Sequence, residues 1–230
     1  ETDLTAAYAS FVNGGKKVEP SLIDRIQDRR GKNIFLENFA ACTNCDEPYI
    51  EENPMPKLVN SSESIFDEAK SYQMVSILKG AVDRGTGRKT KIDGIEIAGK
   101  TGTTNNNTDA WFIGFTSDLI IGVYAGFDKP KSLGKRETGS SVAVPIFRDF
   151  VKNYYQEKPI LPFTIPNGIE LIKINYDTGE IASNFNSSES VYEAFSKSDN
   201  LVSSGEILVG SEGFQIIEVA DEVMEEYVIY

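Results

Sequence analysis

The chain has 230 residues, of which 40% are hydrophobic and 25% are charged, as in ordinary globular proteins. Its 23 basic and 35 acidic side chains give a formal net charge of −12. This charge argues against a nucleic-acid partner, because phosphate binding needs a basic surface. Histidine is absent, which excludes Ser-His-Asp triads, Cys-His dyads and most zinc sites. An acyl-transfer enzyme of this composition must use another base, and lysine is the obvious candidate.

The length of the chain allows one large domain, or one domain with a small appendage. The longest apolar runs, at 110–115 and 119–127, are too short and too interrupted to span a bilayer, and no signal peptide is present. Because the chain starts at Glu1 rather than at Met, we expect a processed product or a piece of a longer protein.

The N-terminal part of the sequence predicts short elements. Residues 4–12 are expected to form a helix that ends at the Asn-Gly-Gly of 13–15, because these residues accept left-handed backbone angles. Residues 18–27 and 33–36 predict two strands joined by a turn. The segment 41–57 contains three prolines and is expected to be a loop.

The segment 64–83 predicts the longest helix. Apolar residues recur in it at helical spacing, and Gly85 and Gly87 end it. The side chains expected to pack into the core are Met74, Ile77, Leu78, Ala81 and Val82.

From residue 92 onward the pattern changes from helix to strand. Apolar and polar residues alternate at 95–97, and further strands at 111–115 and 119–127 follow each other across a short turn. Residues 142–155 predict a closing helix. We therefore expect an α/β fold in which these strands form one side of an antiparallel sheet and the closing helix packs across it.

A proline-rich stretch follows the closing helix and predicts a boundary, because proline lacks the amide donor that regular structure needs. We expect residues 1–157 to form one part of the chain and 158–230 to form a strand-rich extension. Within this extension, 169–176 and 207–219 predict strands. The segment 184–204 is rich in Ser and Asn and is expected to be mobile.

One lysine, Lys100, belongs to two competing motifs. The stretch 94–101 formally fits the P-loop pattern G-x-x-x-x-G-K-T, but its Ile-Glu-Ile-Ala is typical of a strand rather than of an open glycine-rich loop. The same lysine begins Lys100-Thr101-Gly102-Thr103, the K-T-G element of penicillin-recognising serine enzymes. That element needs an exposed strand at the rim of a cleft, where the ammonium supplies positive potential and the hydroxyls bind a carboxylate.

Short motifs surround Lys100 in a fixed order. They are Gly85-Thr86-Gly87, Ala98-Gly99-Lys100-Thr101-Gly102-Thr103-Thr104-Asn105, Asp109-Ala110-Trp111-Phe112-Ile113-Gly114-Phe115, Gly126-Phe127-Asp128, Leu133-Gly134, Glu137-Thr138-Gly139 and Ala143-Val144-Pro145-Ile146-Phe147. In order and spacing this pattern resembles the C-terminal half of the transpeptidase domain of class A, bifunctional penicillin-binding proteins. The likeness runs from near Thr5 to about Tyr155.

The resemblance implies a partial penicillin-recognising transpeptidase fold, similar to that of serine β-lactamases, with an antiparallel sheet flanked by helices. Residues 1–157 would be the C-terminal part of the transpeptidase domain, followed by the extension 158–230. The implied function is a serine-type D,D-transpeptidase that crosslinks peptidoglycan stem peptides in cell-wall synthesis and is a β-lactam target. Lipid-linked glycan strands are implied as further partners, and no metal or organic cofactor is implied. The family's membrane anchor and glycosyltransferase domain would precede this chain, at the periplasmic face of the inner membrane.

The resemblance also assigns roles within the motif. Lys100 would place positive charge beside the nucleophile, and the hydroxyls of Thr101 and Thr103 would bind the carboxylate of the donor peptide or drug. Gly102 and Thr104 would complete the substrate-binding residues. The backbone N–H of Thr103 would be one of two oxyanion-hole donors. The nucleophilic serine would lie upstream of this chain, so we expect the chain alone to be inactive.

Three formal matches to the missing motifs are expected to be coincidental. Ser76 and Lys79 fit S-x-x-K but lie on a helix, with Ser76 facing solvent or a backbone carbonyl. Ser132 and Lys135 fit the same pattern in a Pro- and Gly-flanked loop, which cannot hold a nucleophile rigidly. The S-D-N match at 198–200 follows the K-T-G element, which is the wrong order for this family.

Cys42 and Cys45 cannot complete a zinc site by themselves. In an oxidising periplasm a structural disulfide between them is the better interpretation.

Two other functions stay open. The chain could be a non-catalytic binding or structural remnant, or, less favoured, a P-loop nucleotide-binding protein. Upstream coding sequence would distinguish the remnant from the transpeptidase, and nucleotide binding at 94–101 would support the P-loop. We also expect the isolated chain to expose a strand edge and apolar surface, and so to be poorly stable or to associate.

Overall fold

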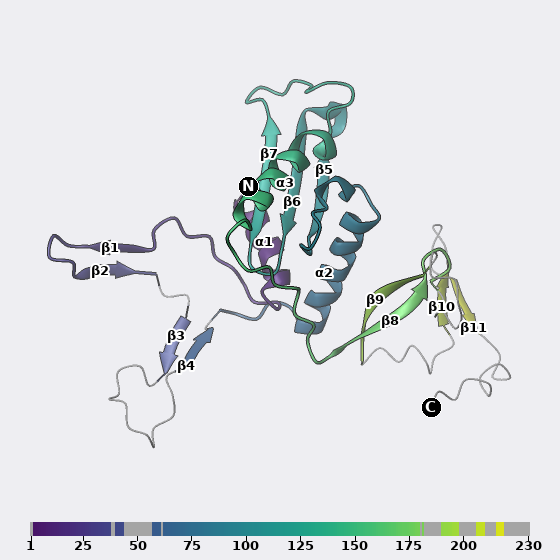
Figure 1. The fold of residues 1–230 in the computed structure, drawn as a ribbon, viewed down its shortest axis with the longest axis horizontal. Helices are drawn as coiled ribbons and strands as arrows, with labels where there is room; N and C mark the ends of the chain where they lie inside the picture. Colours follow the sequence, from purple (N-terminus) through teal and green to yellow (C-terminus); the bar gives the residue numbers. More distant parts are fainter. Residues whose placement is uncertain are drawn as a thin grey trace, which may run out of the picture.

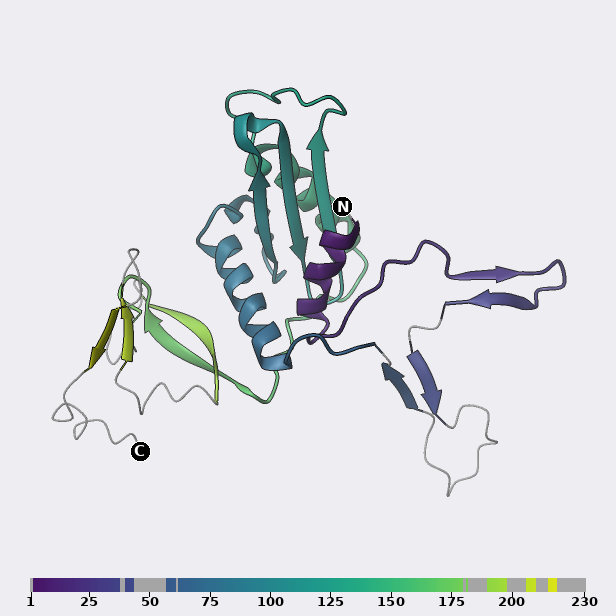
Figure 2. The ribbon, with the colours of Figure 1, turned by 180° about the vertical axis from the view of Figure 1, so that it is seen from behind.

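A three-stranded antiparallel sheet with helices on both faces forms the centre of the computed structural model (Figures 1 and 2). The strand order is β5-β6-β7, with β5 at Ala98–Thr103, β6 at Asp109–Phe115 and β7 at Ile120–Gly126. The structure describes residues 2–37, 62–179, 181 and 190–197, and the backbone of strands at 40–43, 57–60, 206–209 and 215–218.

Helix α3 (Val144–Tyr154) covers one face of the sheet. It corresponds to the closing helix that the sequence predicts over 142–155. One π-helical turn, η3 (Gly139–Ala143), precedes it. Phe147 of α3 is fully buried and meets Phe112 of β6 edge to face, with 4.9 Å between ring centroids. The aromatic pair, together with Val123, Val144 and Val151, makes the core of this layer.

Helices α1 (Thr2–Val12) and α2 (Glu68–Asp83) cover the opposite face. Glycines at 14 and 15, both with positive φ, end α1 as expected. Helix α2 begins four residues later than the sequence predicts, because the carboxylate of Asp67 caps it and accepts from Ala69 N at 3.0 Å and Lys70 N at 3.1 Å.

The face of α2 that enters the core was partly mispredicted. Leu78 and Val82 are buried as expected, but Met74 is 36% exposed and Ile77 is 60% exposed. The other buried side chains of the helix are Ser71 and Val75. The buried stripe is therefore offset by one residue from the one expected, because the sheet contacts the side of α2 that carries Val75.

The strands follow the predicted order with a shorter start. Residues 95–97 lie before β5, where Ile92 and Ile95 make an isolated bridge, so the first strand starts at Ala98. The β6–β7 hairpin turns at 116–118 as predicted, with Phe115 opposite Ile120. A short 3-10 turn, η1 (Arg88–Thr90), links α2 to this sheet.

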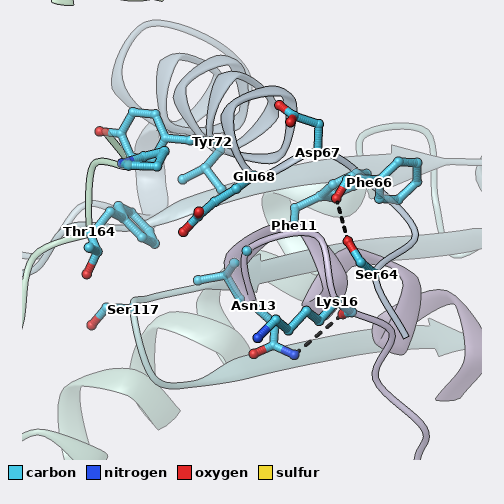
Figure 3. A pocket seen from close by; sticks show the side chains of 15 residues that line it. Phe11, Asn13, Lys16, Ser64, Phe66, Asp67, Glu68, Tyr72, Ser117 and Thr164 are labelled. Atoms are coloured by element: carbon cyan, nitrogen blue, oxygen red, sulfur yellow. Dashed lines mark hydrogen bonds between the residues drawn. The ribbon is translucent and has the colours of Figure 1, made fainter. Parts of the chain in front are cut away.

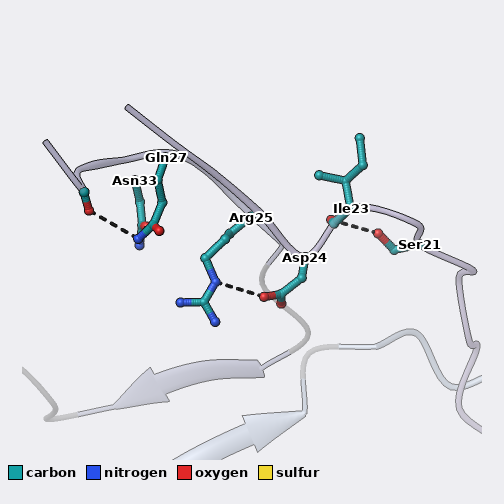
Figure 4. A network of polar contacts seen from close by, with 7 residues as sticks. Ser21, Ile23, Asp24, Arg25, Gln27 and Asn33 are labelled. Carbon is teal, nitrogen blue, oxygen red and sulfur yellow. Dashed lines mark hydrogen bonds and ion pairs between the residues drawn. The ribbon is translucent and has the colours of Figure 1, made fainter. Parts of the chain in front are cut away.

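A separate hairpin of β1 (Arg25–Gln27) and β2 (Asn33–Leu36) extends away from the sheet (Figure 1). The strand predicted over 18–27 is confirmed only at its end. Figure 4 shows the polar contacts along this segment, including Arg25 Nε to Asp24 Oδ2 at 3.0 Å and Gln27 Nε2 to Asn33 Oδ1 at 2.8 Å.

The prediction of a loop over 41–57 was wrong at both ends of this segment, where the structure has strands. Strand β3 (Ala40–Thr43) pairs antiparallel with β4 (Lys57–Asn60), and Cys42 lies in β3. Cys45 lies outside the described residues, so the disulfide stays a prediction.

The described part of the chain after residue 158 contains four strands. Strand β8 (Ile169–Asn175) pairs with β9 (Ser190–Ser196), and β10 (Glu206–Val209) pairs with β11 (Gln215–Glu218). Within the segment 184–204, for which the sequence predicts mobility, residues 190–196 pair with β8 in an unbroken ladder. Residues 184–189 and 198–204 lie outside the described residues.

Candidate functional site

The predicted K-T-G residues lie on β5, at the edge of the central sheet. Lys100 pairs with Ile113 and Thr103 with Ala110, so β6 lies along one side of the strand. No other described strand pairs with the opposite side of β5. Ala98 at the start of the strand is fully buried, whereas Lys100 and Thr103 are exposed. These residues therefore lie on a partly exposed strand at the edge of the described sheet.

The backbone of β5 presents hydrogen-bonding groups along this open edge. Thr104 N donates to Asp109 O on the β6 side at 3.1 Å. Because successive residues of an antiparallel strand alternate in direction, the backbone groups of Thr103 and Thr101 point away from β6. Lys100 Nζ lies on this side and donates to Thr101 O at 2.9 Å. The open edge therefore carries an ammonium group, a carbonyl and the N–H of Thr103.

The hydroxyl of Thr101 has a partner that the sequence did not reveal. Thr101 Oγ1 lies 2.7 Å from Thr86 Oγ1, in the Gly-Thr-Gly turn that follows α2. In the sequence, Gly85 and Gly87 predict only the end of the preceding helix. No local signal identifies the contact, since it joins positions 15 residues apart and depends on how α2 packs beside β5.

The hydroxyl of Thr103 accepts from the backbone N–H of Gly139 at 3.1 Å. This contact places the Glu-Thr-Gly segment against the K-T-G strand. A Cβ atom on Gly139 would lie 2.3 Å from Trp111 O and 2.7 Å from Gly102 O, so only glycine allows the close approach. Thr138 and Ser141 then begin η3 with a reciprocal capping box.

Thr104, also predicted to bind substrate, serves the β5–β6 connection. Its Oγ1 accepts from Asp109 N at 2.8 Å and donates to Asp109 Oδ2 at 3.0 Å. The hydroxyl of Tyr124 donates to Asp109 Oδ1 at 2.7 Å, and that of Thr108 donates to Oδ2 at 2.8 Å. These hydrogen bonds, from Tyr124 first, hold the pKa of Asp109 below its usual range. In the structure, the hydroxyl of Thr104 therefore stabilises the connection between β5 and β6.

Trp111 lies on the same face of the sheet as Lys100 and Gly102. It pairs with Gly102 across β5–β6, and a Cβ on that glycine would lie 3.2 Å from Trp111 Cβ. Its ring centroid is 4.8 Å from that of Tyr124 on β7. The half-buried indole thus lies on the sheet face directly beside the K-T-G strand.

The formal S-x-x-K match at residues 76–79 joins different partners. Ser76 Oγ donates to Glu193 Oε2 at 3.3 Å, which corrects the expectation that it faces solvent or a carbonyl. Lys79 forms an ion pair with Glu96.

The match at residues 132–135 lies in an irregular loop, where Ser132 Oγ accepts from Gly134 N at 3.2 Å. Residues 198–200 lie outside the described residues.

The P-loop interpretation does not fit the structure. A P-loop lysine lies where a loop enters a helix, so that helix N–H groups hold phosphate. Lys100 and Thr101 instead lie within β5, and Gly94 lies in a turn between Ile92 and Ile95.

A cavity of about 460 Å³ lies elsewhere, between α1, α2 and residues 163–166 (Figure 3). Its polar wall includes Asn13, Lys16 and Glu68, and it is also lined by Ser117 in the turn between β6 and β7. No residue of the K-T-G element lines it. In the described part of the chain, no three Cys, Asp or Glu side chains cluster as a metal site would require.

Comparisons with known proteins match more than half of this chain to one family model. The family model of the penicillin binding protein transpeptidase domain matches residues 2–152. The chain is 46% identical over 184 residues to penicillin-binding protein 1A of Rickettsia conorii, covering 77% of this chain and 23% of that protein. It is 31% identical over 239 residues to penicillin-binding protein 1A of Pseudomonas aeruginosa, covering 91% of this chain and 29% of that protein.

A solved structure gives the same result. The crystal structure of penicillin-binding protein 1A from Haemophilus influenzae superposes with a TM-score of 0.66 at 28% identity, covering 83% of this chain and 31% of that one. The chain spans about a quarter of the length of the curated relatives that it matches. No helix among the described residues is both long and apolar enough to cross a bilayer. The chain belongs to the penicillin-binding protein transpeptidase family and is related to the class A protein penicillin-binding protein 1A.

Proposed function

We propose that this chain contributes the K-T-G side of the acyl-transfer site of a peptidoglycan D,D-transpeptidase. The observation that carries the proposal is the open edge of β5, where Lys100 and the backbone of Thr101 and Thr103 are presented together. An extended peptide can add to such an edge as a further strand, with its backbone paired and its side chains directed to pockets. A stem peptide and a β-lactam both offer a carboxylate and a reactive carbonyl to this row of donors.

The chemistry follows from the positions of the donors. A serine hydroxyl, supplied by a segment outside this chain, attacks the penultimate D-Ala carbonyl, and the resulting oxyanion is stabilised by the N–H of Thr103. The C–N bond then breaks, and terminal D-Ala leaves with the proton. An amine of a second stem peptide then attacks the ester, the new amide bond forms as the ester C–O bond breaks, and the proton lost by the amine returns to the serine oxygen. Lys100 supplies positive potential beside the serine, and the hydroxyls of Thr101 and Thr103 bind the donor carboxylate.

The proposed setting rests on the relatives. We propose that the intact protein acts at the periplasmic face of the inner membrane on stem peptides of lipid-linked glycan strands, and that β-lactams acylate it. Residues 1–157 would form the C-terminal part of the transpeptidase domain, with 158–230 as its extension.

Intact-mass spectrometry after incubation with a penicillin tests the proposal. We expect the 230-residue chain to gain no adduct and a longer form, which supplies the family's serine segment, to gain one drug molecule. Lys100→Met in the longer form should abolish the adduct within the assay time. Lys91→Met is the matched control, because Lys91 pairs with Asp83 at 3.2 Å and belongs to no motif.

Two results would contradict the proposal. An adduct on the 230-residue chain alone would place the nucleophile within it, at Ser76 or Ser132. A longer form that folds but is not acylated would support the non-catalytic remnant.

A further inference from the structure

The β8–β9 hairpin of the extension lies against α2 (Figures 1 and 2). Glu193 of β9 contacts α2 through both carboxylate oxygens: Arg84 Nη2 donates to Oε1 at 2.5 Å, and Ser76 Oγ donates to Oε2 at 3.3 Å. Gln73 Nε2 donates to the carbonyl of Ala194 at 3.3 Å. The side chains of Arg84 and Glu193 are 30% and 21% exposed, so their ion pair is more shielded than an open surface pair.

Arg84 reaches Glu193 by folding back over the last turn of α2. Its backbone N–H donates to Gly80 O at 2.8 Å, which makes Arg84 the C-cap of the helix. A Cβ atom on Gly80 would lie 2.7 Å from Arg84 Nη2, so the absence of a side chain there makes room for the guanidinium. The guanidinium carbon also lies 5.4 Å from the ring centroid of Tyr176, which follows β8. The extension therefore holds the residue at which α2 ends.

Only Gly85 separates Arg84 from Thr86, whose hydroxyl meets Thr101 on the K-T-G strand. The intervening turn is closely packed, since a Cβ on Gly85 would lie 2.8 Å from the carbonyl oxygen of Ala81. The turn therefore has little room to change shape, so a displacement of the Arg84 backbone also moves Thr86. The two hydroxyls are 2.7 Å apart, so one must donate to the other. If Thr86 donates, the hydrogen of Thr101 stays available for a ligand carboxylate.

We propose that Glu193 and Arg84 are positioning residues, which fix through Thr86 the orientation of the Thr101 hydroxyl and thereby carboxylate recognition at the K-T-G strand. The inference rests on the proposed function, because it takes Thr101 as a carboxylate ligand. It gives the C-terminal extension a part in a site formed by residues about 90 positions earlier in the chain.

The first test examines the coupling without any reaction. The threonine methyl resonances of Thr86 and Thr101 are assigned by NMR in the full 230-residue chain. We expect both to shift in Glu193→Gln and in Gly80→Ala, which displaces the guanidinium while improving helix propensity. Ser76→Ala is the matched control, because it removes the other contact to the same carboxylate, and it should leave both resonances in place. Unchanged resonances in Glu193→Gln and Gly80→Ala would overturn the coupling.

The second test measures penicillin acylation in the form that supplies the serine, with saturation kinetics that separate initial binding from the chemical step. We expect Glu193→Gln to weaken initial binding about two- to ten-fold, the equivalent of one hydrogen bond, with the acylation rate constant unchanged. Thr86→Val should weaken initial binding by the same factor, whereas Thr86→Ser should bind as the unmutated protein does. The double variant Glu193→Gln/Thr86→Val should bind no more weakly than Thr86→Val alone. Additive losses would overturn the inference. Failure of the unmutated protein to react would contradict the proposed function instead, while the NMR result still decides the coupling.

Discussion

Replacing Gly139 by alanine tests how closely η3 packs on the K-T-G strand. The added Cβ would lie 2.3 Å from Trp111 O and 2.7 Å from Gly102 O. The first distance is about 1 Å shorter than an ordinary van der Waals contact. Both oxygens belong to the backbone of the paired strands β5 and β6, so they cannot rotate away as a flexible side chain would. The start of η3 must therefore move off the sheet.

The cost has two parts. Overpacking in a closely packed layer typically costs about 1–3 kcal/mol. Movement of η3 also breaks the hydrogen bond from Gly139 N to Thr103 Oγ1, of 3.1 Å, which contributes about 1 kcal/mol. We therefore expect Gly139→Ala to lower the free energy of unfolding by about 2–4 kcal/mol. Because Thr103 also loses its partner, penicillin acylation of the serine-containing form should slow.

Urea denaturation followed by circular dichroism measures the change in stability. Gly168→Ala is the matched control, because its Cβ would lie 3.5 Å from the nearest atom, the Cβ of Ala69. This control should change the free energy of unfolding by less than about 0.5 kcal/mol. If Gly139→Ala is as stable as the control and reacts at the unmutated rate, the close packing of η3 on β5 is not what holds Thr103.

Two further predictions concern titrating groups. Burial raises the pKa of Tyr155 from 10.0 to about 12, and the hydrogen bond to Asp118 is the next largest cause. The protonated phenol therefore stabilises the fold below pH 10, and this contribution is lost as the pH rises toward 12. In Tyr155→Phe, the free energy of unfolding should be about 1–3 kcal/mol lower at neutral pH and should fall less steeply over this alkaline range; an unchanged slope would contradict the assignment. The pKa of Asp109 is lowered chiefly by the Tyr124 hydroxyl, so its stabilisation is present above its ordinary value of 3.8 and is lost as the pH falls below it. Asp109→Asn should therefore make urea midpoints less dependent on pH in this acidic range, and a pH dependence equal to that of the unmutated chain would refute this.

The order of the central elements was readable because their signals are local. Apolar runs at 111–115 and 119–127, separated by a short turn, predict β6 and β7 within a few residues of their ends. The motif around Lys100 was equally local, and the structure places it on the edge strand β5.

The errors arose where distant surfaces compete. Apolar residues at 74 and 77 of α2 looked as suitable for the core as Val75, and only the position of the sheet decided between them. Strand β9 lies in a Ser-rich segment that suggests mobility, yet pairing with β8 orders it. A short stretch of sequence cannot show either outcome, because each depends on which other part of the fold packs against the segment.

The sequence by itself determined the family and the K-T-G strand, because closely spaced motifs impose both. Tertiary structure alone decided which groups lie around the proposed site: Thr86 beside Thr101, Gly139 against Thr103, and Glu193 at the end of α2. These contacts join positions from 15 to 109 residues apart. They form only when the helices pack onto the sheet and the extension packs onto α2, since burial of apolar surface brings the polar partners within hydrogen-bonding distance.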